Sequence, residues 1–277
     1  MINWFPGHMK KTFDIIKQKE KLFDVFIIVL DSRCPISSYN YEFDKIAPNK
    51  KRIFVFTKID MTNKNRFQEL MKQYNNPKDE ILALNLKNAA KSQSQLHKVI
   101  KKIYNQKNKI NAAKGYKTPP LKIGVLGVPN AGKSTLINIL AKSKVAKVRN
   151  EAGVTRSEQW INCNNEYMLL DTPGLLWPKF DDQSTAVKLA IIGSIKTESL
   201  DQKNLVYESY KLISQFKPDS LTKLGLVPTE DEIKIYDNII ELARKLKHLD
   251  KNKQIIINDT YKYLMNYFKN LTDIIYD

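Results

Sequence analysis

One eight-residue segment has the residue types and the spacing of a phosphate-binding loop. Residues 127–134 are Gly-Val-Pro-Asn-Ala-Gly-Lys-Ser and fit the pattern G-x-x-x-x-G-K-S. The glycines let backbone N–H groups turn toward phosphate oxygens, Lys133 adds positive charge beside the β and γ phosphates, and Ser134 offers a hydroxyl to Mg²⁺. A helix that starts here directs its positive end at the anion. We therefore expect a nucleotide site with Mg²⁺, lined also by Ala131, Gly132 and Thr135.

A second candidate magnesium ligand is Asp171, in the segment Asp171-Thr-Pro-Gly174. A carboxylate at the end of a strand, beside a phosphate loop, can hold Mg²⁺ through water. Gly174 allows its N–H group to approach a γ-phosphate closely. Taken alone, the segment would be an ordinary turn; the glycine loop upstream favours the metal interpretation.

A third segment, Thr57-Lys-Ile-Asp60, is similar to the guanine-reading pattern Asn-Lys-x-Asp. The Asp60 carboxylate would accept hydrogen bonds from guanine N1–H and the exocyclic amine, a pair of donors that adenine lacks. The stem of Lys58 would pack along the base and the ribose. The sequence departs from the pattern at Thr57, because a hydroxyl makes fewer hydrogen bonds than an amide. A charged loop after a strand is the alternative.

Each of the three segments follows an apolar run that predicts a buried strand: 121–126 precedes the phosphate loop, 166–170 precedes Asp171, and 52–56 precedes Thr57. Further strands are expected at 25–30 (before a polar loop from Asp31), 81–85 and 157–163. Helices are expected at 9–22, 63–74, 92–106 and 134–140, and the polar, basic stretch 107–120 is the best linker candidate. Beyond about residue 181 the pattern is helical. The alternation of strands and helices predicts an α/β fold with a mostly parallel sheet, followed by a smaller all-helical part.

The composition bounds the class of protein. The 277 residues carry a formal net charge of +17, which attracts polyanions and by itself leaves RNA, DNA and acidic membranes open as partners. No apolar run approaches the roughly 18 residues that span a bilayer, and residues 1–8 lack the apolar core of a secretory signal. Two cysteines, Cys34 and Cys163, cannot form a zinc site by themselves. These features predict a reduced, cytoplasmic protein.

The order of the segments is unusual, because the guanine-like segment precedes the phosphate loop and Asp171–Gly174 comes last. In this order the chain resembles circularly permuted GTPases, and within them the ribosome biogenesis GTPase A (YlqF) family. The resemblance covers nearly the whole chain and is carried by the phosphate loop and by Trp4-Phe-Pro-Gly-His-Met9, Asp31-Ser-Arg-Cys-Pro-Ile-Ser-Ser38, Gly153-Val-Thr-Arg156 and Asp171-Thr-Pro-Gly-Leu-Leu-Trp-Pro-Lys-Phe180.

The resemblance implies a permuted P-loop GTPase domain at 1–180, with a basic helix region at 1–22, and a helical RNA-contacting domain at 181–277. It implies late assembly of the large (50S) ribosomal subunit, with rRNA and a subunit precursor as partners and hydrolysis stimulated by that particle. We expect a monomer without DNA or membrane partners. Thr155 is similar to the switch threonine that completes the Mg²⁺ shell, and Asn85 begins the loop that backs the guanine, where Leu86 and Ala89 depart from the family pattern. A Lys-rich stretch at 247–253 replaces a glycine-rich turn.

Catalysis needs a group other than Leu175, because leucine cannot orient water. The resemblance suggests His8, as a group that positions water or stabilises charge, or as a structural residue. Asn130 resembles the asparagine of GTPases that hold K⁺ beside the phosphates, and the alternative is a loop cap. Arg156 could be an internal finger or a contact to phosphate or RNA.

Three other functions compete with an rRNA-binding assembly GTPase. One is a stand-alone metabolic NTPase or kinase, and another is a nucleotide-gated RNA adaptor that does not hydrolyse GTP. The weakest is a membrane-recruited GTPase, because the basic helix has no lipidation motif beside it.

Overall fold

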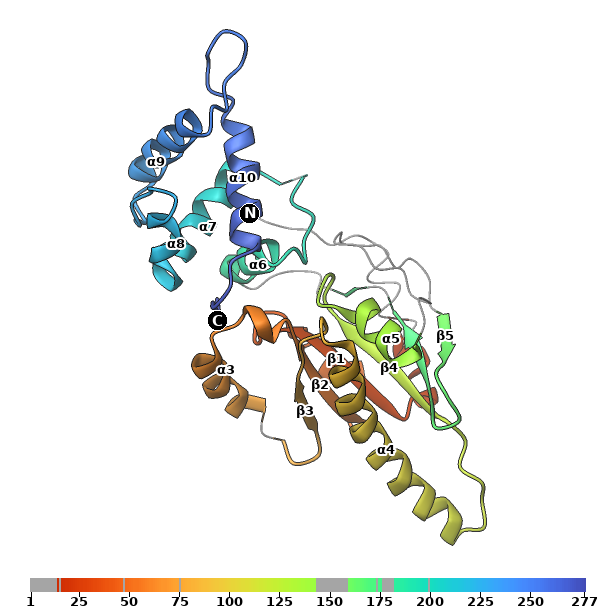
Figure 1. Cartoon of the computed structure of the whole chain (residues 1–277). Coiled ribbons are helices and arrows are strands. Elements are labelled where there is room, and N and C mark those ends of the chain that lie inside the picture. Colours follow the sequence, from red (N-terminus) through yellow and green to blue (C-terminus); the bar gives the residue numbers. More distant parts are fainter. Residues whose placement is uncertain are drawn as a thin grey trace.

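The computed structural model describes residues 14, 16–46, 48–74, 76–142, 159–172, 174–175, 182–198 and 200–277. In this part of the chain, six strands form one sheet in the order β3-β2-β1-β4-β6-β5 (Figure 1). The strands are β1 (Val25–Asp31), β2 (Lys51–Thr57), β3 (Glu80–Ala83), β4 (Leu121–Gly127), β5 (Gln159–Asn162) and β6 (Tyr167–Asp171). Among these six described strands, only β5 and β6 pair antiparallel. The predicted mostly parallel sheet is confirmed.

The centre of the sheet is β1, whose seven residues are all buried. A strand that is covered on both faces has a continuous apolar run, as the sequence of β1 does. The register pairs Asp31 with Thr57 on β2, and Val29 with Gly127 on β4. The carboxyl ends of β1, β2 and β4 therefore meet at one edge of the sheet.

The strand order reverses direction between β1 and β4. The chain proceeds from β1 outward through β2 and β3, and then returns to place β4 on the other side of β1. In open α/β sheets, ligands bind at the carboxyl ends of strands where the order reverses. This topology puts the expected nucleotide segments at the preferred position for a ligand.

The helices around the sheet are α2 (Phe43–Ile46), α3 (Lys64–Met71), α4 (Ala89–Ala113) and α5 (Lys133–Ala141), with short 3₁₀ turns η1 (Glu20–Leu22), η2 (Ile59–Met61) and η3 (Lys72–Tyr74). Asn63 and Asn88 cap α3 and α4 by accepting hydrogen bonds from backbone N–H groups. The predicted helix 92–106 is too short: α4 continues through 107–113, the first half of the predicted linker. The predicted helix 9–22 lies mostly outside the described residues; 16–18 are helical.

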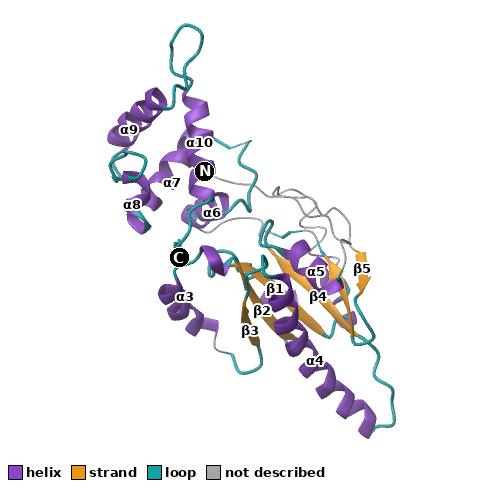
Figure 2. Ribbon diagram, viewed as in Figure 1, coloured by secondary structure: helices purple, strands orange, loops and turns teal. Residues whose placement is uncertain are grey.

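The second part of the chain is helical, as predicted (Figure 2). Its helices are α6 (Gln183–Ile191), α7 (Gln202–Phe216), α8 (Pro218–Thr222), α9 (Glu232–Lys245) and α10 (Ile257–Lys269). Helix α10 packs against α7 and α9, and α6 packs against α7. Asp182, Asp201 and Asp231 cap α6, α7 and α9. The predicted boundary at 180/181 lies outside the described residues. Every described helix is too short or too polar to cross a membrane.

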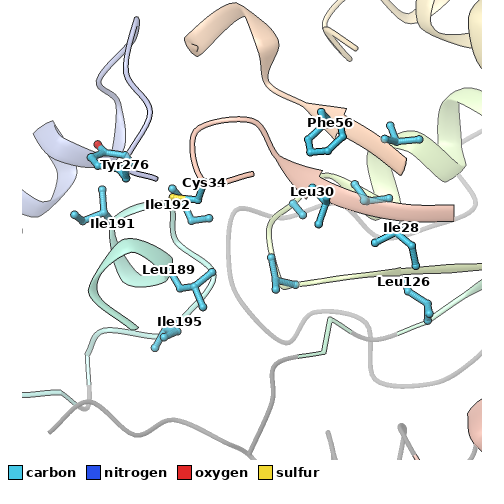
Figure 3. Close-up of a cluster of buried hydrophobic side chains, with 14 of the residues drawn as sticks. Ile28, Leu30, Cys34, Phe56, Leu126, Leu189, Ile191, Ile192, Ile195 and Tyr276 are labelled. Carbon is cyan, nitrogen blue, oxygen red and sulfur yellow. The ribbon is translucent and has the colours of Figure 1, made fainter. Parts of the chain in front are cut away.

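The sheet and the helices share one hydrophobic core. Figure 3 shows Tyr276, from the segment after α10, beside Cys34, Ile191 at the end of α6 and Ile192 just after it, with the sheet residues Leu30 and Phe56 further along. The backbone N–H group of Tyr276 donates to the Arg33 carbonyl at 2.8 Å. Residues 271–276 therefore connect the helical part to the loop that follows β1.

Candidate nucleotide-binding site

The phosphate loop leaves β4 and enters α5 through Gly132. Gly132 has φ = +101°, a left-handed conformation that side chains rarely adopt, and it is the N-cap of α5. A Cβ atom there would lie 3.1 Å from the Leu86 side chain. The strand–loop–helix arrangement expected from the motif is present, and it aims the amino end of α5 at the loop.

The ammonium of Lys133 folds back over the loop. Its Nζ donates to the carbonyls of Gly127 at 3.1 Å and Val128 at 3.0 Å. Burial lowers the pKa of Lys133 to about 8, and the nearby Asp171 carboxylate opposes that shift. A bound polyphosphate would favour the charged form, because an adjacent anion raises the pKa of an ammonium.

Asp171 ends β6 and is 5% exposed. Within the described part of the chain its Oδ1 has no hydrogen-bond partner. Burial raises the pKa of Asp171, and Lys133 partly offsets the rise. A buried acceptor without a partner costs about 1–3 kcal/mol. A hydrated Mg²⁺ ion would satisfy it, so this carboxylate, together with the partly buried Ser134 in the first turn of α5, fits such an ion.

The segment after β6 lies directly on the phosphate loop. The Thr172 hydroxyl donates to the Val125 carbonyl at 2.6 Å, and the Leu175 N–H group donates to the Gly127 carbonyl at 3.0 Å. A Cβ atom on Gly174 would lie 2.7 Å from both Cα and N of Pro129, which is closer than real Cβ atoms approach. Glycine is therefore required at position 174 for this contact.

The guanine-like segment is joined to the phosphate loop by Thr57. Thr57 is fully buried, and its hydroxyl lies 2.6 Å from the carbonyl oxygen of Ala131 and 3.1 Å from that of Leu30. The shorter contact is the stronger hydrogen bond. The hydroxyl at this position thus reaches the loop despite the departure from the usual asparagine.

Asp60, which is exposed, and Asn85, which is partly buried, both contact Lys87. Asp60 is in η2, and its carboxylate is 2.8 Å from the Lys87 ammonium. The Asn85 side chain accepts a hydrogen bond from the Lys87 N–H group at 2.9 Å. Lys87 thus links the two, and the loop that contains Asn85 and Leu86 borders both Gly132 and Asp60.

Asn130 connects the phosphate loop to the helical part. Its Nδ2 donates to the Gly193 carbonyl at 2.6 Å, and the Ser194 hydroxyl donates to the Pro129 carbonyl at 2.7 Å. Gly193 and Ser194 follow α6. The side-chain amide of Asn130 is therefore already engaged on one side by residues that the motif did not indicate.

The structure brings together the predicted residues of the phosphate loop (Asn130, Ala131, Gly132, Lys133, Ser134, Thr135), Asp171, Gly174 and the base segment (Thr57, Lys58, Asp60, Asn85). His8, Thr155, Arg156, Trp177 and Phe180 lie outside the described residues. Two buried residues, Asp31 and Arg33, adjoin the base segment and had no assigned role. Two signals could have indicated them: they directly follow a predicted buried strand, and they belong to the segment 31–38 that carries part of the family resemblance.

A family model described as 50S ribosome-binding GTPase matches residues 122–259. Ribosome biogenesis GTPase A of Priestia megaterium is 37% identical over 86% of this chain and 83% of that protein. The protein of the same name in Bacillus pumilus is 34% identical over 93% of this chain and 94% of its own length.

The fold has solved counterparts. A GNP-bound YlqF from T. maritima covers 95% of this chain and 97% of its own, with a TM-score of 0.66 and 18% sequence identity. A GDP-bound YlqF structure gives the same TM-score and identity. At this identity the likeness shows the fold alone, and it confirms the predicted GTPase fold.

The relatives confirm the resemblance that the motifs carry, over most of the chain. The chain is a GTPase and belongs to the ribosome biogenesis GTPase A family.

Proposed function

We propose that this protein is a GTP-hydrolysing switch in late assembly of the large (50S) ribosomal subunit, and that it binds rRNA in a nucleotide-dependent way. The relatives named ribosome biogenesis GTPase A support a role in ribosome biogenesis. The single observation that best supports a guanine-nucleotide switch is the Thr57–Ala131 hydrogen bond, because it fixes the base segment against the phosphate loop.

The proposed reaction is attack of water on the γ-phosphorus of GTP, which gives GDP and phosphate. Lys133 would bind the β and γ phosphates, and the Gly174 N–H group would meet the γ-phosphate. Ser134, Asp171 and Thr155 would hold Mg²⁺, which supplies charge neutralisation on the transferred group. Asp60, Lys58 and Asn85 would bind the base. Leu175 leaves the positioning of water to another group, and the assignment of His8 stays a prediction.

A monovalent cation is a further part of the proposal. Asn130 is in the phosphate loop beside Lys133, where an amide oxygen could coordinate K⁺. Such an ion would add positive charge near the γ-phosphate, where other GTPases use an arginine. Because Nδ2 of Asn130 is bound to Gly193, its oxygen is the atom left for this task.

The proposed rRNA contact is supported by charge. The net charge is +17, and the outer face of α4 has a hollow of about 440 Å³ lined by Lys98, Lys101, Lys102, Asn105, Gln106 and Lys109. Lysines that line a concave surface attract phosphate groups by counterion release. We propose residues 1–180 as the GTPase domain and 181–277 as the second, RNA-contacting domain, acting as a monomer in the cytoplasm.

Sedimentation with purified large-subunit precursors tests this function. The protein should co-sediment with the precursors in the presence of a non-hydrolysable GTP analogue and Mg²⁺, dissociate with GDP, and hydrolyse GTP faster when particles are present. Binding should weaken steeply with salt, because phosphate contacts release counterions. Depletion of the protein in cells should cause large-subunit precursors to accumulate.

Each competing function gives a different result in the same experiment. A metabolic NTPase would hydrolyse nucleotide without binding the particles. A non-catalytic adaptor would bind the particles without hydrolysing GTP. Equal binding with GDP and with the GTP analogue would contradict the switch.

A further inference from the structure

A buried cluster of charges lies beside the base segment, at the end of β1. The Asp31 carboxylate accepts hydrogen bonds from the backbone N, Nε and Nη2 of Arg33 at 3.0, 3.0 and 2.8 Å. It also accepts one from Lys58 Nζ at 2.7 Å. Asp31 and Arg33 are 0% and 1% exposed. Replacing a buried ion pair with apolar residues is often neutral or stabilising. The cluster therefore calls for an explanation beyond stability.

The electrostatics of the cluster favour the ionised form of Asp31. Burial raises the pKa of Asp31, but the charges of Arg33 and Lys58 outweigh burial and hold that pKa well below its usual range. Burial lowers the pKa of Lys58, and Asp31 opposes that change. Asp31 is thus the anion that holds the ammonium of the partly buried Lys58 in place.

Lys58 is held in an uncommon conformation. Its backbone has φ = +56°, in the left-handed region that residues other than glycine seldom adopt. It precedes η2, which contains Asp60. Since the stem of Lys58 is the part expected to cover the guanine base, an anchored ammonium fixes the line along which that stem runs.

The other side of Arg33 reaches the helical part. Its Nη1 donates to the carbonyl of Lys269, the last residue of α10, at 2.7 Å. Its own carbonyl accepts the hydrogen bond from the Tyr276 N–H group. The last carbonyls of a helix lack partners within the helix and carry its negative end, so a guanidinium is a favourable partner.

A second connection runs in parallel. The Ile274 N–H group donates to the carbonyl of Met61, the last residue of η2, at 3.3 Å. The Asp273 carboxylate accepts a hydrogen bond from the Asn63 side chain at 3.0 Å and pairs with Lys217, between α7 and α8, at 3.1 Å. The segment after α10 thus contacts the residues that directly follow Asp60.

We propose that Asp31 and Arg33 are positioning residues for guanine recognition. Asp31 holds Lys58 in place for the base, and Arg33 joins this pair to the end of α10. Binding of a guanine nucleotide and docking of residues 269–276 then favour each other. Such coupling is reciprocal, because each event must change the affinity of the other by the same factor. The inference rests on the proposed assignment of Lys58 and Asp60 to the base.

The test compares Arg33→Lys with Arg52→Lys. A lysine at position 33 can keep one contact to Asp31 but cannot also reach the Lys269 carbonyl, because it lacks the planar fork of arginine. Arg52 is a matched control: it is also paired to an aspartate, Asp44 at 2.5 Å, but it lies near the opposite end of β2 from Thr57. The measurements are the Kd for GDP and the hydrogen exchange of the Tyr276 amide with and without GDP.

We expect GDP to slow exchange of the Tyr276 amide in the unaltered protein, while the Ile235 amide of α9 does not respond. Arg33→Lys should raise the Kd for GDP about tenfold and reduce the protection by the same factor. Arg52→Lys should change neither. Asp60→Asn tests the base assignment separately. An unchanged Kd for GDP in that variant would refute the assignment of Asp60 to the base, whereas the coupling is decided by the effect of GDP on exchange of the Tyr276 amide.

A purely structural role for Arg33 predicts another result, in which both variants lose stability and GDP protects the Tyr276 amide equally in all proteins. That result overturns the proposal. If Arg33→Lys does not fold, the unaltered protein still decides, because absence of any GDP effect on Tyr276 exchange rejects the coupling.

Discussion

Asn130 has an observed partner, Gly193, which would orient its amide oxygen for the proposed K⁺ ion. Its backbone has φ = 58°, and its side chain contacts the residues that follow α6. Nδ2 binds the Gly193 carbonyl, and this anchor fixes the direction of the amide oxygen. An oriented oxygen is a better cation ligand than a freely rotating one, because less entropy is lost on binding.

The first prediction concerns the cation dependence of hydrolysis. Turnover in potassium chloride should exceed turnover in sodium chloride by roughly tenfold, equivalent to about 1.4 kcal/mol of transition-state stabilisation. Asn130→Ala should remove this difference while GDP still binds. The measurement is phosphate release at constant ionic strength. Equal rates in the two salts would leave Asn130 only its structural bond to Gly193.

The elements were predictable where their residues carry a periodic apolar signal. The strands β1, β2 and β4 were found because both of their faces are buried and their sequences are nearly all apolar. The last turns of α4 were missed because 107–113 are largely exposed, Ile110 included, so no buried apolar spacing marks them. The site was predicted at the three motifs. The hydrogen bond from Arg33 to Lys269 was not predicted, because its acceptor is a backbone carbonyl and the sequence gives no sign of which carbonyl a side chain will reach.

The contact between the segment after β6 and the phosphate loop supports a second prediction. Gly174→Ala should weaken binding of a GTP analogue about tenfold or more and slow hydrolysis, with GDP affinity nearly unchanged. The added methyl group would overlap Pro129, and overpacking of this kind costs about 1–3 kcal/mol. The measurement is a pair of titrations with the two nucleotides.

Gly115→Ala is the matched control for Gly174→Ala. Gly115 is exposed beyond α4, where a φ of +75° makes alanine unfavourable for the local backbone, but a Cβ atom there would meet nothing within 4 Å. Both nucleotides should bind this variant as they bind the unaltered protein. An equal loss of GDP and analogue affinity in Gly174→Ala would show that position 174 shapes the loop without sensing the γ-phosphate.

The molecule as a whole has a continuous core, with polar links between its two parts. The links include Arg33 to Lys269, Asn130 to Gly193, and Lys188 of α6 to Asp277 at 3.2 Å. The Asp277 carboxylate in turn accepts hydrogen bonds from the N–H groups of Ile36 and Ser37. Parts that share a core and several buried polar contacts unfold together, because separating them exposes both.

Thermal unfolding tests this prediction. Tryptophan fluorescence reports on the first 180 residues, because Trp4, Trp160 and Trp177 all lie there, whereas far-ultraviolet circular dichroism is dominated by the helices. The two transitions should coincide. A hundredfold excess of GDP over its Kd should stabilise both by about 2.7 kcal/mol. Two separate transitions, unchanged at lower protein concentration, would show that the parts unfold independently.

The bond between Arg33 and Lys269 joins residues 236 positions apart in the sequence. Its formation closes most of the chain into a single loop, and closing a long loop is entropically unfavourable until other contacts have already shortened it. Contacts of such high sequence separation slow folding. During refolding, the sheet and the phosphate loop can therefore assemble first. The contacts of Asp31 and Arg33 that hold Lys58 are completed only when α10 packs against Arg33.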